Sequence, residues 1–408
     1  MTNAADQIAI LDAMRDPAVK ADPYPFYRSL LERGPLIETT FGDHLLTRHA
    51  DCFNVLRDAR FSSNDQHKAG YENITELIRQ LGFEDLLGLM QRIMLFADPP
   101  DHTRLRRLVS KAFTPKAIEA MRPRIAALVD DILDDADGRG EIEVVDELAF
   151  RLPVTVISEM LGVPLDDHEQ LRTWTSAAVA ALDPNDNPSE LFPAAEALRA
   201  MRGYFHDLVE ARRGDLADDL LSAMIAAEDE GDRLSHDELL DTTLLLFAAG
   251  HETTVNLISG GMFNLLANPA ELQRLQADPS LIGTAVEELL RFGPPVQFTA
   301  RTTTTEVEVA GTTLPRGSEL IVLIAGANRD PEVFPAPDTL DIGREENRHL
   351  AFGGGIHLCL GAPLARVEGQ EAIGRLVRRF PGLRLATDDV PWKPTTTIRG
   401  PAQLRLTW

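Results

Sequence analysis

The chain has 408 residues, and its 44% hydrophobic and 25% charged residues are typical of a folded protein with a substantial core. Its formal net charge of −24 argues against nucleic acid or an anionic membrane surface as a partner. Two cysteines are too few for a disulfide framework, which favours a reducing, intracellular setting. No stretch reaches the ~18 apolar residues that span a bilayer, and residues 1–20 do not resemble a signal peptide, so we expect an unanchored cytoplasmic protein.

Most of the predicted elements are helices. The clearest is 115–137, where apolar side chains recur at helical spacing. Residues 62–88 lack periodicity and favour loops and short helices. Further helices are expected at 26–33, 50–56, 144–161, 166–182 and 193–211, with a break at 184–188 and a turn at 231–234.

Strands are expected only near the two ends of the chain. The sequence has no internal repeat and no linker rich in Gly or Ser. We therefore expect one domain over 1–408, mainly α with a minor β part. The expected strands are 37–40 and 44–47, paired as a hairpin, together with 307–310 and 319–324.

The longest predicted helix begins at Ser235, which forms a capping-box pattern with Glu238, and ends near Asn268-Pro269. Its side chains are apolar almost all round, so we expect it to be buried. Its middle carries Gly250, which costs roughly 1 kcal/mol relative to alanine, and Glu252, which is costly to bury unless it is satisfied.

Two structural explanations for this middle segment stay open, namely close packing at Gly250 and a salt bridge at Glu252. A zinc-protease interpretation of His251-Glu252 fails, because the second histidine of that motif would fall on Val255.

A glycine-rich loop, residues 352–361, holds Cys359 directly before a predicted helix that starts at Pro363. Unpaired amides at a helix N-terminus favour a thiolate. An ordinary buried cysteine is the alternative explanation for this residue taken alone.

The whole loop pattern, Phe-x-x-Gly-x-His-x-Cys-x-Gly, resembles the haem-binding loop of the cytochrome P-450 family and departs from it at no signature position. The resemblance extends over nearly the whole chain. It implies the fold of that family, with the long buried central helix over haem b and a small β-rich subdomain. It also implies that Cys359 ligates the iron as a thiolate.

The resemblance assigns further residues to the haem. His102, Arg106, Arg301 and His357 would pair with the two propionates. The other residues expected at the haem are Phe352, Gly353, Gly361 and Ala249.

The central helix resembles the oxygen-activating helix of the same family. Gly250 would let the helix open for dioxygen, Thr253 would hydrogen-bond to the reduced oxygen and nearby waters, and Glu252 would help to pass protons inward. A later helix carries Glu288 and Arg291 in the Glu-x-x-Arg pattern, and with Arg344 they would form a buried structural triad.

The resemblance implies a monomeric monooxygenase that takes electrons from a ferredoxin. Arg104, Arg107 and Lys111 are expected to form an outward basic patch that receives this donor. The substrate would be a medium-sized hydrophobic molecule of macrolide, steroid, terpenoid or xenobiotic type. Its candidate contacts are mostly apolar: Leu89, Leu95, Leu245, Ala248, Val296, Phe298 and Ile398.

Two alternatives stay open. One is a peroxide-driven or isomerising haem-thiolate enzyme, against which the retention of Glu252 and Thr253 argues. The other is a non-catalytic haem protein, which would need no proton relay.

Overall fold

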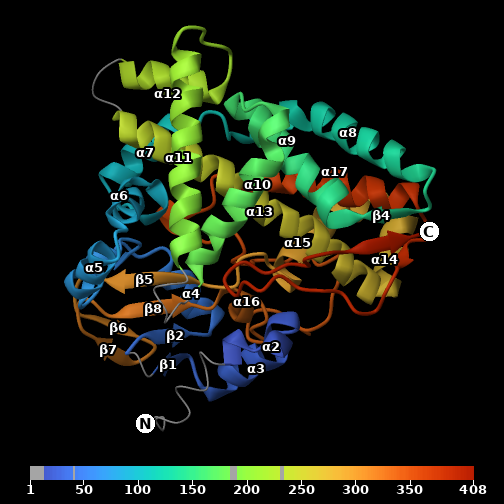
Figure 1. The fold of residues 1–408 in the computed structure, drawn as a ribbon. Helices are drawn as coiled ribbons and strands as arrows, with labels where there is room; N and C mark the ends of the chain where they lie inside the picture. The colour runs from blue at the N-terminus through green and yellow to red at the C-terminus, as the bar shows by residue number, and fades with distance from the viewer. Residues whose placement is uncertain (1–12, 40–41, 184–190, 230–233) are drawn as a thin grey trace.

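The computed structural model describes residues 13–39, 42–183, 191–229 and 234–408. The break predicted at 184–188 lies outside these residues, as does most of the turn predicted at 231–234. Helices form the larger part of the molecule, and most of the strands gather with the N-terminal helices at one side (Figure 1). The predicted fold class, mainly α with a minor β part, is confirmed.

The helices follow the apolar periodicity of the sequence closely at most predicted positions. The N-terminal half holds α2 (Pro17–Ala21), α3 (Tyr24–Arg33), α4 (His49–Val55), α5 (Tyr71–Gln80), α6 (Glu84–Arg92), α7 (Asp101–Val109), α8 (Pro115–Asp137), α9 (Arg151–Leu161) and α10 (His168–Val179). The C-terminal half holds α11 (Phe192–Arg213), α12 (Leu220–Asp229), α13 (His236–Ala267), α14 (Pro269–Ala277), α15 (Ile282–Phe292), α16 (Ile324–Ala327) and α17 (Ala362–Arg379).

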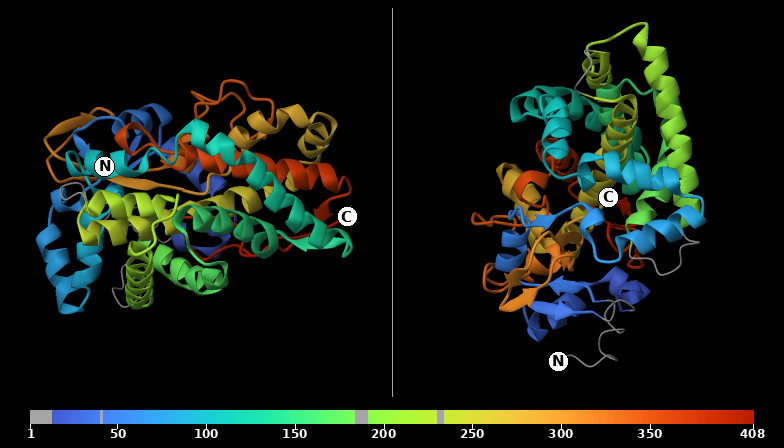
Figure 2. Two further views of the ribbon diagram at one scale, coloured as in Figure 1. Left: turned by 90° about the horizontal axis from the view of Figure 1, so that it is seen from above. Right: turned by 90° about the vertical axis from the view of Figure 1, so that its left-hand side faces the viewer.

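The central helix is α13, and the predicted capping box is present. The Ser235 hydroxyl accepts from the Glu238 N–H, and the Glu238 carboxylate accepts from the Ser235 N–H. Most of its side chains are buried, because α9, α11 and α17 pack around it. Beside it, α8 lies along α17 in both Figure 1 and Figure 2. The long buried helix that the sequence predicts therefore forms the centre of the fold.

The strands are short and come from distant parts of the chain. A five-stranded sheet has the order β1-β2-β8-β5-β3, in which only β2 and β8 are parallel. A second sheet has the order β4-β10-β9, and β6 and β7 form a separate hairpin. The strands are β1 (Leu36–Glu38), β2 (His44–Leu46), β3 (Phe61–Ser62), β4 (Glu141–Glu143), β5 (Thr299–Thr303), β6 (Val307–Val309), β7 (Thr312–Leu314), β8 (Glu319–Val322), β9 (Arg384–Leu385) and β10 (Arg405–Thr407).

Two details differ from the prediction. The helix expected over 144–161 begins as a π-helix, Val144–Phe150, and becomes α-helical at Arg151. The strand expected at 307–310 pairs with Thr312–Leu314 rather than joining 319–324, because Ala310 and Gly311 both have positive φ and turn the chain back at once.

Candidate functional site

The Cys359 loop is held in place by its own backbone and by the end of α4. The Cys359 N–H donates to the Phe352 carbonyl at 2.9 Å. Gly353 and Gly355 have φ of 69° and 63°, a conformation that favours glycine. A Cβ on Gly355 would also lie 2.4 Å from the Leu56 carbonyl oxygen. The glycines therefore let the loop close tightly against α4 and fix where the sulfur points.

The Cys359 side chain is accessible, yet burial by the groups around it raises the pKa of its thiol. The Gly361 N–H, the Arg106 guanidinium and the Ala362 N–H oppose this effect without cancelling it. Burial thus outweighs the effect of the helix N-terminus on the thiol, and a bound cation such as iron would favour the thiolate.

The middle of α13 also exposes a short stripe, although the helix around it is buried. Ala249 is exposed, and Leu245, Ala248 and Thr253 are half-buried. Leu245, Ala249 and Thr253 follow one another at intervals of four residues, so they share a helix face. Accessible residues on α13 and at Cys359, which lies three residues before α17, fit a large flat cofactor between these elements, and the two helices also contact each other.

Four nitrogen-bearing side chains gather beside the Cys359 loop. The His102 and His357 ring centroids are 4.4 Å apart, and Arg106 Nη2 donates to the Leu358 carbonyl at 2.6 Å. Burial and the nearby Arg301, His102 and Arg106 lower the pKa of His357 to about 3. The cluster therefore brings together all four residues that the sequence assigned to propionates.

Few carboxylates lie near these four nitrogen-bearing side chains in the described chain. His357 Nε2 is buried without a hydrogen-bond partner in the described chain. Arg301 is 7% exposed, burial lowers the pKa of its guanidinium to about 10, and it donates to the Ala300 carbonyl at 2.7 Å. Among the described residues, Asp98 is the carboxylate that raises the pKa of Arg301, and it already accepts from Ser62. Two carboxylates of a bound group would satisfy these donors, so the residues present fit haem b.

Both structural explanations for the middle of α13 are observed. A Cβ on Gly250 would lie 3.1 Å from Ile157 Cγ1, so the glycine permits close packing on α9. Glu252 Oε1 accepts from Lys393 Nζ at 2.5 Å. The Thr253 hydroxyl donates to the Ala249 carbonyl at 3.1 Å, as an alcohol in a helix often does when its other partners are missing.

The structural triad is present in full. Glu288 accepts from Arg291 Nε and Nη2, both at 2.8 Å, and from Arg344 Nε at 3.1 Å. The Asp341 N–H and the Asn347 amide also donate to Glu288. Glu288 and Arg291 are both fully buried. The triad fastens α15 to the segment before the Cys359 loop.

The candidate substrate contacts divide into two groups. Val296 and Ile398 lie side by side in an antiparallel bridge, and Leu95 is exposed. Phe298 instead packs into the core between the five-stranded sheet and α3, and Leu89 packs into the main helical core. Phe298 and Leu89 therefore pack against other core side chains, and their contact with a substrate stays a prediction.

A further correction concerns the predicted basic patch. Arg104 does not point outward, because its Nη1 donates to Glu238 Oε2 at 3.0 Å at the start of α13. Arg107 and Lys111 are exposed, and no ion pair involves them within the described residues. The patch is therefore smaller than the sequence indicated.

The sequence interpretation missed two titratable residues near Thr253. Lys393 lies in a loop without periodicity, so no local signal indicated its contact with Glu252. Glu368 lies on α17 and is 1% exposed, and neither of its carboxyl oxygens has a hydrogen-bond partner in the described chain. Burial raises its pKa well above the usual value, and the neighbouring Thr254 hydroxyl opposes this. Its apolar neighbours Leu364 and Val367 could have marked it.

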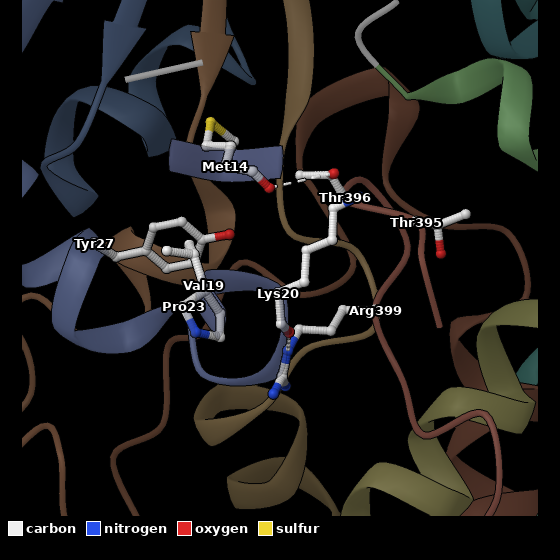
Figure 3. Close-up of a pocket in the computed structure, with 8 residues that line it drawn as sticks. All are labelled: Met14, Val19, Lys20, Pro23, Tyr27, Thr395, Thr396 and Arg399. Carbon is white, nitrogen blue, oxygen red and sulfur yellow. Dashed lines mark hydrogen bonds between the residues drawn. The ribbon is translucent and has the colours of Figure 1, made fainter. Parts of the chain in front are cut away.

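Figure 3 shows a small cavity where α2 and α3 meet the segment 395–399. Its volume of about 10 Å³ holds no more than a water molecule. Arg399 closes it by donating to the Lys20 carbonyl at 2.9 Å. This contact fixes the segment that carries Ile398.

None of the described helices is long and apolar enough to cross a bilayer.

Comparisons with known proteins agree with this geometry. A family model described as Cytochrome P-450 matches residues 72–404. Cytochrome P-450 107B1 of Saccharopolyspora erythraea is 44% identical over 361 residues, 87% of each chain. Cytochrome P-450 monooxygenase PikC of Streptomyces venezuelae is 41% identical over 95% of this chain and 91% of its own. Ligand-free CYP164A2 of Mycobacterium smegmatis has a TM-score of 0.90 at 40% identity, over 98% of this chain and 100% of its own.

Proposed function

The chain belongs to the cytochrome P-450 family, and from this we propose that it hydroxylates a medium-sized hydrophobic molecule with dioxygen and two electrons from a ferredoxin. It is a monooxygenase by class, and its cofactor is haem b. We take residues 1–408 as a single domain that works as a cytoplasmic monomer. The observation that carries the proposal is the accessible Cys359, in a loop beside an anion-poor cluster of His102, Arg106, Arg301 and His357.

Each part of the site has its own task. Cys359 presents its sulfur to the iron, and Phe352, Gly353 and Gly361 shape the loop around it. The four nitrogen-bearing side chains hold the propionates. Haem b with a thiolate ligand supplies the iron at which dioxygen is activated, and the thiolate favours cleavage of the O–O bond. Ala249 leaves room on α13 for the flat macrocycle.

Protons reach the site through side chains of α13. Lys393 is 20% exposed and Glu252 only 8%, so their ion pair connects a partly solvated group to a buried one. The Glu252 side chain would take a proton from Lys393 and turn toward the accessible stripe of α13. This movement would bring the proton toward Thr253. The Thr253 hydroxyl would then turn from the Ala249 carbonyl, accept a hydrogen bond at its Oγ1 from the incoming donor and pass its own proton onward. Gly250 allows the helix backbone to adjust there.

Apolar side chains would hold the substrate and keep water out. Leu245 and Ala248 on α13, Leu95, Val296 and Ile398 carry this part of the proposal. The relatives include a vitamin D(3) 25-hydroxylase of Pseudonocardia autotrophica and a 6-deoxyerythronolide B hydroxylase of Saccharopolyspora erythraea. A molecule of macrolide, steroid, terpenoid or xenobiotic type fits the same apolar surface.

The test is oxygen transfer. The purified holoenzyme with a ferredoxin, its reductase and a hydrophobic substrate that shifts the haem spin state is supplied with isotopically labelled dioxygen. The proposal expects a hydroxylated product that contains a single labelled oxygen atom. A product labelled from water, or turnover with peroxide that Thr253→Ala leaves unchanged, would contradict it.

A further inference from the structure

An arginine one turn into α17 lies against the loop that carries Cys359. The Cζ atom of Arg366 is 4.5 Å from the centroid of the Phe352 ring. Phe352 begins the Cys359 loop, and its carbonyl accepts the Cys359 N–H at 2.9 Å. The face of the guanidinium therefore makes a cation–π contact with a residue that is hydrogen-bonded to the iron ligand.

The edge of the same guanidinium is bound by a carboxylate of α15. Arg366 Nε donates to Glu287 Oε1 at 2.7 Å, and Arg366 Nη2 donates to Glu287 Oε2 at 2.9 Å. This is the planar, bidentate geometry that fixes both the position and the tilt of a guanidinium. The two side chains are 37% and 28% exposed, so the pair is partly shielded from water.

A buried histidine orients Glu287 in turn. His349 Nδ1 accepts from the Ala351 N–H at 3.2 Å, so the ring carries its proton on Nε2, which donates to Glu287 Oε2 at 3.1 Å. Burial opposes ionisation of Glu287, yet the hydrogen bonds from His349 and Arg366 outweigh it and lower the pKa of this carboxyl to about 2. The carboxylate that holds Arg366 is therefore ionised at neutral pH.

The positive charge of Arg366 acts on the sulfur. Together with Arg106, it is among the charges that favour ionisation of the Cys359 thiol. Arg106 belongs to the cluster assigned to the propionates, whose carboxylates would offset its charge, whereas Arg366 is bound to Glu287. When the haem takes up an electron, the iron and its sulfur ligand gain one negative charge. A cation held near the sulfur therefore favours the reduced state.

We propose that Arg366 raises the reduction potential of the haem ligated by Cys359, and that Glu287 and His349 are positioning residues that hold its guanidinium over Phe352. The inference rests on the thiolate ligation in the proposed function, to which it adds a group that controls uptake of the electrons. The alternative is that Arg366 only fastens α17 to α15, which pack together.

Another arginine of α17 is a matched control. Arg375 Nε donates to Glu371 Oε2 at 2.8 Å, and Arg375 Nη1 donates to Asp130 Oδ2 of α8 at 2.6 Å. Its side chain is 24% exposed, so it resembles Arg366 both in burial and in fastening α17 to a neighbouring helix. It lies about 14 Å further along the helix axis. Arg375→Gln therefore removes the same charge and a comparable contact without touching Phe352.

The experiment is a dye-mediated redox titration of the substrate-free holoenzyme, monitored by absorption, with no electron-donor protein present. Arg366→Gln should lower the equilibrium constant for one-electron reduction at least about threefold, which is a fall of about 28 mV in the reduction potential. Glu287→Gln should instead raise the potential, because its amide oxygen still accepts from Arg366 while the negative charge is gone. Arg366→Lys should keep most of the wild-type potential, and Arg375→Gln should keep all of it.

A fastening role predicts shifts in the same direction in Arg366→Gln and Glu287→Gln, because each variant weakens the same contact. Shifts in the same direction, an unchanged potential in Arg366→Gln, or an equal shift in Arg375→Gln would therefore overturn the proposal. If Arg366→Gln does not retain haem, Glu287→Gln still decides, since an unchanged or lowered potential there contradicts the proposal.

The reduced carbon monoxide complex separates this inference from the proposed function. Each variant should keep the thiolate spectrum of the wild type, because Cys359 is untouched. A wild type without that spectrum would instead refute the proposed function, and this inference with it.

Discussion

Lys393 Nζ donates to Glu252 Oε1 at 2.5 Å, although the two residues are 141 positions apart in the chain. The contact joins the C-terminal segment to the middle of α13, beside Thr253. A buried acid that is paired with a partly exposed base is suited both to hold the segment and to pass a proton. The first prediction separates these two uses.

Glu252→Gln should slow product formation by at least about tenfold, because the amide cannot carry a proton toward Thr253. The solvent deuterium isotope effect on turnover should rise, while the haem content stays that of the wild type. Glu308→Gln, at an exposed position on β6, is the matched control and should change neither quantity. If the rate and the isotope effect of Glu252→Gln are unchanged, Glu252 carries no proton, and its role is limited to the ion pair that holds the C-terminal segment.

Glu368 should make the protein less stable as the pH rises. Burial raises its pKa in the folded chain well above the ordinary 4.5, so the unfolded chain loses its proton first. Above pH 4.5 the free energy of unfolding should therefore fall by up to about 1.4 kcal/mol per pH unit from this group, until the folded chain also ionises. Glu368→Gln should remove that dependence.

Thermal unfolding of the wild type and Glu368→Gln at pH 5 and at pH 8 measures the difference. The stability advantage of the variant should be larger at pH 8. An advantage that does not change with pH would mean that Glu368 is ionised in the fold.

Glu288→Gln should destabilise the protein by about 3–5 kcal/mol, because it leaves Arg291 buried without its carboxylate. The holoenzyme should unfold at lower urea concentration and lose haem as it does so. Glu119 is the comparison, since it pairs with Arg122 at the surface with 60% of its side chain exposed. Glu119→Gln should cost less than about 1 kcal/mol. Similar urea midpoints for the two variants would contradict a structural role for the triad.

Arg107→Glu should slow electron transfer from a ferredoxin, most strongly at low salt, because exposed charges mainly affect the rate of encounter. Stopped-flow reduction of the haem under carbon monoxide measures this rate. Arg316→Glu, at an exposed position outside the Cys359 region, should have little effect. Equal rates for wild type and Arg107→Glu would exclude this surface as the docking site.

The sequence was informative wherever a local pattern carries the structure. The capping box of α13, the hairpin of β1 and β2 and the glycine loop at Cys359 each depend on residues that are close in the chain. The sheet β4-β10-β9 could not be predicted, because its strands of two or three residues are too short for an alternating pattern and come from distant segments.

The same limit applies to the site. The family pattern allowed Cys359 and the four propionate candidates to be named from the sequence, and the structure places them close together. Lys393 and the partners of Arg104 were missed, because an ion pair between distant segments leaves no trace in local periodicity. Glu368 was also missed, although its apolar neighbours on the same helix are a local signal that could have marked it.

The most direct test of the account is the absorption spectrum of the reduced protein with carbon monoxide. If Cys359 ligates the iron as a thiolate, the Soret band lies far to the red, and Cys359→Ala abolishes that band. A band at the position of histidine-ligated haem, or a red-shifted band that survives in Cys359→Ala, would contradict the central claim.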